Sequence, residues 1–545
     1  MSDIVLPAGS LAPHAARPDL DRKPHPGGLL VFLLLLVSGL GYAGYGILSD
    51  TSSVGEPLAI GALVLLGIAL LIALGFEFVN GFHDTANAVA TVIYTHSMAP
   101  MVAVIWSGAW NFLGVVLSSG AVAYSIITLL PVELILQVGS AAGYAMIFAL
   151  LFAAIIWNLG TWSVGLPNSS SHALIGSVIG VGLANQIMAP ATERTSGVDW
   201  GQASSVLKAL AFSPLAGFVL AAVLLLIMKA LVRNKALYES PNGRTPPPLW
   251  IRSLLILTCT GVSFAHGGND GQKGMGLIML ILIGVAPTAY ALNRTMPEAA
   301  TPGFIQTVQA VQPVLQSHAA GAAAMPAADA RRIVGDALRS RKVDQPQVFA
   351  ALDAISRDIA QQVQSYGAIK HVPAAATPNM RNDMYLSADA IRLMLKQGAK
   401  FEPAQAGALK SYQSALNAGT RFIPTWVKVS VAVALGLGTM VGWKRIVVTV
   451  GEKIGKQHLT YAQGASAELV AAGTIGLAEV YGLPVSTTHI LSSGVAGTMA
   501  ANGSGLQWST VRNLAAAWIL TLPAAITLAG ILYWLLRNVF DMIAH

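Results

Sequence analysis

The 545-residue sequence is short of charge and of cysteine. Only 10% of its residues are charged, against roughly 25% in an ordinary soluble domain. That share is too small to cover the surface of a large water-soluble enzyme, so this class is excluded. One cysteine, Cys259, allows no internal disulfide and no cysteine-based metal site. The 54 glycines and 27 prolines follow no short period, which excludes a collagen-like chain.

What the sequence has in abundance is apolar residues, which make up 54% of the chain. They form runs that reach or approach the roughly 20 residues needed to cross a bilayer. Three further runs are shorter and are typical of half-helices or re-entrant segments. The sequence therefore predicts an all-α polytopic membrane protein with ten to twelve transmembrane helices. The long runs are 29–48, 58–79, 101–130, 144–162, 206–231, 254–292, 425–441, 462–481 and 514–536, and the short ones are 86–94, 173–187 and 490–501.

Charge is concentrated in one stretch, 293–424, which holds 14 of the 32 basic and 9 of the 25 acidic residues. We interpret it as a polar insert between a first membrane part, 29–292, and a second, 425–545. The tail 1–28 is polar and Pro-rich, and we expect it to be disordered. Bases in the insert alternate with acids without interleaved aromatics, so no nucleic-acid partner is expected.

Within the insert, 301–330 has the composition of a flexible linker, whereas 330–366 and 387–416 have an amphipathic helical pattern. Two short loops elsewhere are strongly basic, around 229–252 and 444–456. The positive-inside rule places both in the cytoplasm, but it does not orient a loop as long as the insert.

Two polar motifs each occur twice. The first reads NGFHDTAN at 80–87 and HGGNDGQK at 266–273, and each copy centres an aspartate in an apolar stretch. The second reads GLPNSSSH at 165–172 and GLPVSTTH at 482–489, with seven of eight positions identical or similar. Two linked motif pairs of this kind indicate an internal duplication.

The spacing of the motifs supports the duplication. Asp84 and His172 are 88 residues apart, and Asp270 and His489 are 219 apart. The difference of 131 is close to the 133 residues of 292–424. Duplicated halves with interrupted helices are the sequence signature of a transporter site, usually built from inverted repeats. We therefore expect two inverted repeats with broken or re-entrant helices.

The two motif aspartates, Asp84 and Asp270, lie where an ionised side chain costs several kcal/mol or more, so a functional role is the first hypothesis. The alternative is a carboxylate satisfied by a neighbouring helix or placed at a helix end. Glycines around both residues permit non-helical backbone, whose carbonyls can coordinate cations. Both copies are thus suited to bind a proton, a cation or a metal ion.

The second motif is suited to an anion. Pro167 and Pro484 can occupy the first turn of a helix, where hydroxyl groups would stand beside unpaired backbone N–H groups. Such a helix start binds phosphate readily. The alternative is plain N-capping by serine or threonine. His172 and His489 could titrate near neutral pH or could simply bond to a carbonyl group.

Four more charged residues lie in or near these stretches. Lys273 either pairs with Asp270 or contacts the anion. Glu77 lies about two turns before the first motif aspartate and has no acidic counterpart in the other half, which makes it a candidate for proton coupling. Glu468 and Glu479 are eleven residues apart and could share a helix face, as a polar lining or as two end-of-helix charges.

At these motifs the chain resembles the inorganic phosphate transporter (PiT) family, which carries a duplicated Gly-Ala-Asn-Asp-Val-Ala-Asn signature. The departures from that signature resemble the bacterial low-affinity branch, whose motifs read GFHDTANAVATVIYT and HGxNDGQKGxG. The resemblance covers both membrane parts and the insert. In the first copy Gly81, Asp84, Ala86 and Asn87 match the signature, and in the second Gly267, Asn269 and Asp270 match.

The resemblance implies a secondary transporter in the bacterial inner membrane, without a cofactor, that imports inorganic phosphate. It also implies coupling to protons and uptake of a neutral complex of phosphate with a divalent metal such as Mg²⁺. His83 and Lys273 alter the motif that holds Na⁺ in sodium-coupled members. The implied phosphate ligands are Ser169, Ser170, Ser171, Ser486, Thr487, Thr488, Asn87, Asn269 and Lys273, and the implied coupling or metal residues are Asp84, Asp270, Glu77, His172 and His489.

Other functions remain open at this point. A Na⁺-coupled phosphate symporter or a sulfate symporter would use the same scaffold. A membrane-embedded metallohydrolase would need a His-Glu-x-x-His helix or a nucleophile elbow, and the sequence has neither. A channel would conduct without accumulation.

The family also implies a cytoplasmic insert and allows a homo-oligomer. The helix count instead places the insert opposite the basic loops if 254–292 is one span.

Overall fold

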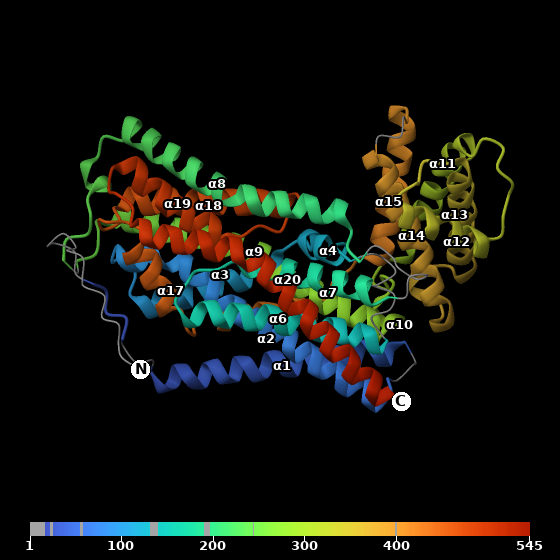
Figure 1. Ribbon diagram of the computed structural model, residues 1–545, viewed down its shortest axis with the longest axis horizontal. Coiled ribbons are helices and arrows are strands. Elements are labelled where there is room, and N and C mark those ends of the chain that lie inside the picture. Colours follow the sequence, from blue (N-terminus) through green and yellow to red (C-terminus); the bar gives the residue numbers. More distant parts are fainter. Residues whose placement is uncertain are drawn as a thin grey trace.

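The structure is a computed structural model that describes residues 17–21, 25–54, 58–130, 140–189, 197–243, 245–397 and 401–544. In these residues all regular secondary structure is helical, apart from one isolated β-bridge between Gly455 and Leu506. The helices form an elongated bundle with a separate group of shorter helices, α11 to α15, at one end (Figure 1).

Eight of the described helices are long and apolar enough to cross a membrane. Three further helices lie among them, α16 (Thr425–Gly438), α18 (Tyr461–Val480) and α19 (Thr487–Asn502). Counting the bent pair Pro403–Thr420 and Thr425–Gly438 as one span gives up to nine candidate spans in the described residues, roughly consistent with the predicted ten to twelve. The eight are α1 (Pro26–Ser53), α2 (Ile60–Tyr94), α3 (Pro100–Leu117), α6 (Ala141–Ser163), α7 (Ser170–Met188), α8 (Trp200–Leu231), α9 (Leu249–Val285) and α20 (Trp508–Ala544).

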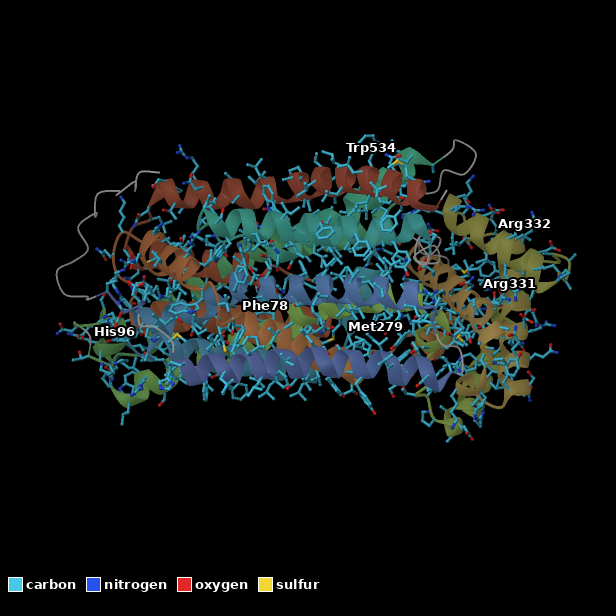
Figure 2. The ribbon with its side chains drawn as sticks, turned by 90° about the horizontal axis from the view of Figure 1, so that it is seen from below. Phe78, His96, Met279, Arg331, Arg332 and Trp534 are labelled. Atoms are coloured by element: carbon cyan, nitrogen blue, oxygen red, sulfur yellow. The ribbon has the colours of Figure 1, made fainter. Side chains whose placement is uncertain are left out.

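The outer surface of this bundle is apolar, as a lipid-facing surface must be. Ile519 and Trp534 on α20 are 73% and 54% exposed, whereas Met279 inside the bundle is 1% exposed. Figure 2 shows Trp534 at the edge of the bundle, with Arg331 and Arg332 beyond one end of it. The chain is thus a multi-pass membrane protein with its polar groups at the ends and in its interior.

The helices that carry the aspartate motif are not broken, contrary to the sequence prediction. α2 and α9 run through Asp84 and Asp270 without interruption. The motif glycines serve close packing instead. A Cβ atom on Gly81 would lie 2.3 Å from the carbonyl oxygen of Leu435, and one on Gly267 would lie 2.1 Å from that of Asn111. Only glycine allows these backbones to approach so closely.

The two halves are inverted relative to each other. Glu77 in α2 lies against Gly274 of α9, whereas Thr91 and Thr258, at the other ends of these stretches, both bond to Glu468. The pairing runs in opposite directions along the two helices, so α2 and α9 are antiparallel. The internal duplication is therefore an inverted repeat in three dimensions.

The two copies of the second motif each begin a helix, as expected, but the helix begins after the proline of the motif and not at it. α7 begins at Ser170 and α19 at Thr487, with Ser169 and Ser486 as N-caps. Pro167 therefore lies before the helix and not in its first turn, and so does its counterpart in the second half. These helices of 19 and 16 residues start inside the bundle next to the aspartates.

The insert is a helical unit with its own apolar core. α11 (Thr301–His318) occupies residues expected to form a linker, so that prediction is wrong. Buried residues such as Phe304 and Val308 on this helix supply the reason, since they pack against the other helices of the insert. The remaining helices are α12 (Ala327–Ser340), α13 (Pro346–Tyr366), α14 (Thr377–Gln397) and α15 (Pro403–Thr420).

Ion pairs tie the insert to the start of α8. Asp199, the N-cap of α8, accepts bonds from Arg392 at 2.8 Å and from Arg341 at 2.9 Å. Burial alone would raise the pKa of Asp199, but the hydrogen bond and charge of Arg392 lower it overall. The carboxylate is therefore ionised at neutral pH and holds both arginines.

The insert and the two basic loops lie at opposite ends of the bundle (Figure 1). α9 connects the two ends as one continuous helix, as the single-span count assumed. Two parts of the predicted disordered tail, residues 1–16 and 22–24, lie outside the described residues. So does Arg244 in one of the basic loops. Residues 17–21 of the tail pack on the basic end, where Arg17 pairs with Glu452 at 2.8 Å. Pro26–Gly28 form the first turn of α1, so the prediction of disorder is wrong for these residues.

Candidate functional site

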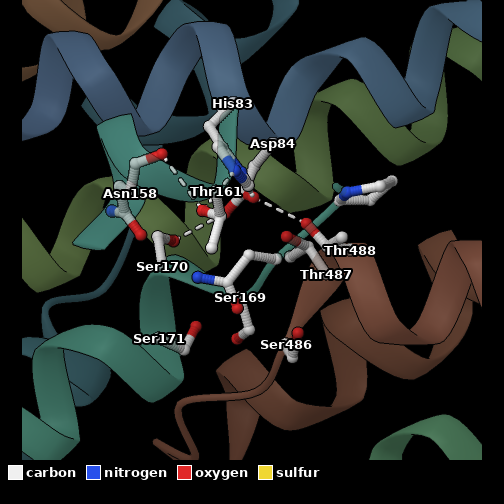
Figure 3. A network of polar contacts seen from close by, with 12 residues as sticks. His83, Asp84, Asn158, Thr161, Ser169, Ser170, Ser171, Ser486, Thr487 and Thr488 are labelled. Atoms are coloured by element: carbon white, nitrogen blue, oxygen red, sulfur yellow. Dashed lines mark hydrogen bonds and ion pairs between the residues drawn. The ribbon is translucent and has the colours of Figure 1, made fainter. Parts of the chain in front are cut away.

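The first-half aspartate, Asp84, lies in the middle of the bundle and is 3% exposed. It accepts hydrogen bonds of 2.6 Å from Ser170 of its own half and of 2.6 Å from Thr488 of the other half (Figure 3). His83 Nδ1 lies 3.2 Å from its Oδ1 atom. Both copies of the serine/threonine motif thus meet at one buried carboxylate.

The second-half aspartate, Asp270, is fully buried and has a fixed cation as its partner. Lys273 Nζ lies 2.6 Å from Asp270 Oδ1 and also donates to Ser171. Thr487 Oγ1 lies 3.4 Å from the other carboxylate oxygen. Lys273 pairs with the aspartate and at the same time reaches the hydroxyl-bearing start of α7, so its two predicted roles are compatible.

The helix starts combine capping with presentation of hydroxyls. Ser169 Oγ accepts from the backbone N–H of His172 at 3.2 Å, and Ser486 Oγ accepts from that of His489 at 3.1 Å. These two serines are N-caps, which is the plainer of the predicted readings. The imidazole rings of His172 and His489 lie 4.6 Å apart, so the two half-helices meet at these side chains.

Asn269 supports the site rather than facing it. Its Nδ2 donates to the carbonyl oxygen of Leu483 at 3.1 Å, and its Oδ1 lies 3.5 Å from the N–H of Val485. It thereby holds the loop before α19. The side chain of Asn87 lies outside the described residues.

A third ligand for a cation comes from His266, which sequence reasoning missed. Oxygen atoms of Asp84 and Asp270 and a nitrogen of His266 all lie within 4.8 Å of one another. His266 Nδ1 is held by Asn111 Oδ1 at 2.6 Å, and Nε2 lies 3.4 Å from Asp270. The spacing of His266 and Asp270, four residues apart on a helix, was the available signal.

The remaining acids extend along the interior of the bundle. Glu77 is fully buried, with one oxygen 3.3 Å from Asn80 Nδ2 and the other without a hydrogen-bond partner in the described residues. Glu468 is also fully buried and accepts from Thr91 and, at 2.5 Å, from Thr258. Glu479 bonds to Gln272 at 3.2 Å. Both glutamates of α18 bond to residues of α9, which fits a shared helix face, the first of the two alternatives.

Comparison with known proteins identifies the family of the chain. The model of the Phosphate transporter family matches residues 80–529. The chain is 41% identical over 495 residues to the low-affinity inorganic phosphate transporter PitA of Escherichia coli (strain K12), covering 88% of this chain and 98% of the relative. It is 39% identical to PitB of the same organism, with the same coverage.

A solved structure described as the sodium-dependent phosphate transporter is similar with a TM-score of 0.48 and 19% identity, covering 87% of this chain and 99% of that one. The relatives are named as transporters and not as enzymes. The family match spans both motif pairs, both membrane parts and the insert. The chain belongs to the phosphate transporter family.

Proposed function

We propose that this protein is a secondary active transporter that imports inorganic phosphate across the bacterial inner membrane together with protons, by alternating access. The observation that carries the proposal is the meeting of two antiparallel aspartate helices with two helix N-termini at one buried place. The aspartates supply the cation half of such a site and the helix starts supply the anion half.

The charge of the site favours cotransport over uptake of phosphate alone. Asp84 and Asp270 carry two negative charges, and Lys273 neutralises one of them. A phosphate anion entering this buried place would add further negative charge in a low dielectric, which costs several kcal/mol per ion. Accompanying cations remove that cost, so phosphate and cation should move together.

Protons fit the second half of the site better than Na⁺ does. The ammonium group of Lys273 already lies 2.6 Å from Asp270, where it would compete with a sodium ion for the carboxylate. Glu77, with its carboxyl group against the backbone of Gly274, adds a buried acid next to this pair. Buried acids of this kind are the usual proton carriers of transporters.

The cluster of Asp84, Asp270 and His266 also suits a divalent metal that travels with phosphate. Two carboxylates and one imidazole form a ligand set that Mn²⁺, Co²⁺ or Zn²⁺ accepts readily, whereas Mg²⁺ prefers an all-oxygen shell. A neutral metal–phosphate complex would lower the cost of burying the anion. The proposal thus includes metal phosphate as a second form of the substrate.

The insert faces the outside of the cell in this proposal. The basic loops at the opposite end fix the cytoplasmic side by the positive-inside rule. Since Cys259 is the one cysteine in the sequence, a Cys259→Ala background allows a direct test. Ser340→Cys in the insert should react with a membrane-impermeant maleimide in intact cells, and Ser240→Cys in a basic loop should react only after permeabilisation.

The function itself is tested by uptake of radiolabelled phosphate into proteoliposomes under an imposed pH or Na⁺ gradient, with and without divalent metal. We expect accumulation driven by the pH gradient. If phosphate does not accumulate under any of the imposed gradients, the proposal of a secondary active transporter is contradicted. Uptake that responds only to Na⁺, or that sulfate inhibits as well as phosphate does, would favour the alternative symporters.

A further inference from the structure

One arginine of the insert is buried without a counter-ion. Arg381 on α14 is 4% exposed, and its Nε and Nη2 atoms have no hydrogen-bond partner in the described residues. Its guanidinium group lies 4.9 Å from the centre of the Tyr385 ring. Tyr385 is 8% exposed, and its hydroxyl group also lacks a described partner. Being four residues apart, the two side chains share one face of α14.

A second arginine stands close to this face. Arg421, between α15 and α16, lies 5.3 Å from the centre of the ring of Tyr124 in α4 (Ala121–Ile127) and also interacts with Tyr385. Burial lowers the pKa of both Arg381 and Arg421, although an arginine keeps its charge under all these conditions. We call Arg381, Tyr385, Arg421 and Tyr124 the joint cluster.

The acids nearby are already paired with other bases. Asp389 accepts from Arg392 at 2.6 Å, and Asp199 accepts from Arg392 and Arg341. Among the described residues no carboxylate forms an ion pair with Arg381 or Arg421. The joint between the insert and the membrane part therefore carries an excess of positive charge.

A buried guanidinium group without an anion is costly, since burying an unpaired charge is far less favourable than burying a neutral polar group. Water can accept its hydrogen bonds but cannot neutralise it. A phosphate oxyanion does both, because its oxygens match the planar N–H groups of arginine in pairs. The unpartnered tyrosine hydroxyl offers a further donor to the same anion.

The joint cluster is also connected to the central site. Ser125, the residue after Tyr124, donates to the carbonyl oxygen of Gly482 at 2.5 Å. Gly482 opens the second GLPVSTTH motif, which leads to Thr487 and Thr488 in the central site. An anion held at the joint cluster would thus lie beside the loop that presents the central hydroxyls.

We propose that Arg381, Arg421 and Tyr385 form an outer binding site for a phosphate oxyanion, in the joint between the insert and the membrane bundle. The ligand of this outer site is inorganic phosphate before its transport, an identification that rests on the proposed function. A phospholipid headgroup has the same chemistry and is the other source that the test must distinguish. The insert would then be a receptor for the substrate as well as a folded appendage.

The test counts phosphate sites on the full chain. The protein is purified in an uncharged detergent and titrated calorimetrically with inorganic phosphate, as wild type, as Arg381→Gln and as Arg332→Gln. The last variant is the matched control, because Arg332 lies in the same insert with its side chain 69% exposed. We expect two sites in wild type and control but one in Arg381→Gln, with a roughly tenfold higher KM for uptake in that variant.

Native mass spectrometry of the same three proteins separates the two sources. A phospholipid retained by wild type and control but lost from Arg381→Gln, with a single inorganic phosphate site throughout, would assign the oxyanion to lipid. One phosphate site in all three proteins and no differential lipid would overturn the outer site. Two titrating sites in a protein that accumulates no phosphate would overturn the proposed transport function and leave the outer site standing.

A second pair of variants covers a failure to fold. Arg421→Gln removes the partly buried partner, and Arg381→Lys keeps the charge while losing the planar pair of donors. We expect loss of the outer site in the first and weakened binding in the second. The proposal is contradicted if the Arg381→Lys and Arg421→Gln proteins both bind phosphate as tightly as wild type does.

Discussion

The two halves of the central site share a frame but differ in charge. In the first half Asp84 is bonded by two hydroxyl groups, those of Ser170 and Thr488. In the second half the counterpart of Thr488 is Ser171, and Lys273 occupies it while pairing with Asp270. Duplication kept the two carboxylates and the helix starts, and one substitution gave the second half a permanent positive charge.

This difference indicates a division of labour. The described partners of Asp84 are two hydroxyl groups and the imidazole of His83, with no lysine or arginine among them, so this carboxylate can exchange a proton or a metal ion. A carboxylate paired with a lysine is already neutralised and can hold the site together. We infer that Asp84 exchanges its cation more readily than Asp270 does, and four predictions test the comparison.

The largest effect is expected from removing either carboxylate charge. Asp84→Asn and Asp270→Asn should each reduce phosphate uptake by about 100-fold or more, since each leaves buried partners unsatisfied. Uptake into proteoliposomes measures this. Only Asp270→Asn should also lower the thermal stability clearly, because it strands Lys273 without a counter-ion. Equal destabilisation by both variants would erase the proposed division.

The second effect is expected from restoring the symmetry of the duplication. Position 273 corresponds to Asn87 in the first copy of the motif, so Lys273→Asn gives both copies the same residue there. We expect uptake to fall roughly 10- to 100-fold and its dependence on the pH gradient to weaken, because Asp270 loses a buried partner worth about 3–5 kcal/mol. Lys229→Gln on α8 is the control, and unchanged pH dependence in Lys273→Asn would remove the lysine from coupling.

A smaller effect is expected from the acid that the second half lacks. Glu77→Gln keeps the shape of the side chain and its bond to Asn80 but removes the ionisable group. Uptake driven by a pH gradient should fall about tenfold, within the range of a positioned acid or base, while exchange of phosphate without a gradient should change little. Glu298→Gln in the insert is the control. Equal losses in both assays would make Glu77 a packing residue.

The smallest effect is expected where the halves are alike. Ser169→Ala and Ser486→Ala each remove an N-cap, at a cost of about 1 kcal/mol of stability. The two variants should therefore show similar small decreases in thermal stability. A large difference between them, measured under the same conditions, would show that one of the serines does more than cap its helix.

The sequence predicted the polytopic helical fold and brought the right motifs together, because apolar runs and repeated polar motifs are local patterns. It could not show that α2 and α9 continue through the motif. Glycines permit both a break and a close helix contact, and only the position of Leu435 and Asn111 against Gly81 and Gly267 decides between them. The closeness of His266 to Asp84 was missed for the same reason, since it depends on how α2 packs against α9, although the spacing to Asp270 was visible in the sequence.

The insert shows the opposite limit. Residues 301–330 have a composition typical of a linker, yet Phe304 and Val308 find an apolar core that only the folded insert supplies. The predicted side of the membrane for the insert depends on whether 254–292 is a single span. α9 is one continuous helix, as a single span requires, and the side on which the insert lies stays a prediction.

The close packing of α2 and α9 has a mechanical consequence. Two long helices whose backbones touch their neighbours at Gly81 and Gly267 can neither bend nor slide there without separating those contacts. The short helices α7 and α19 are held in the same way, since a Cβ atom on Gly180 would lie 2.3 Å from the carbonyl oxygen of Ile526 and one on Gly497 would lie 2.1 Å from that of Phe218. The four helices of the central site can therefore move only together with the helices that they touch.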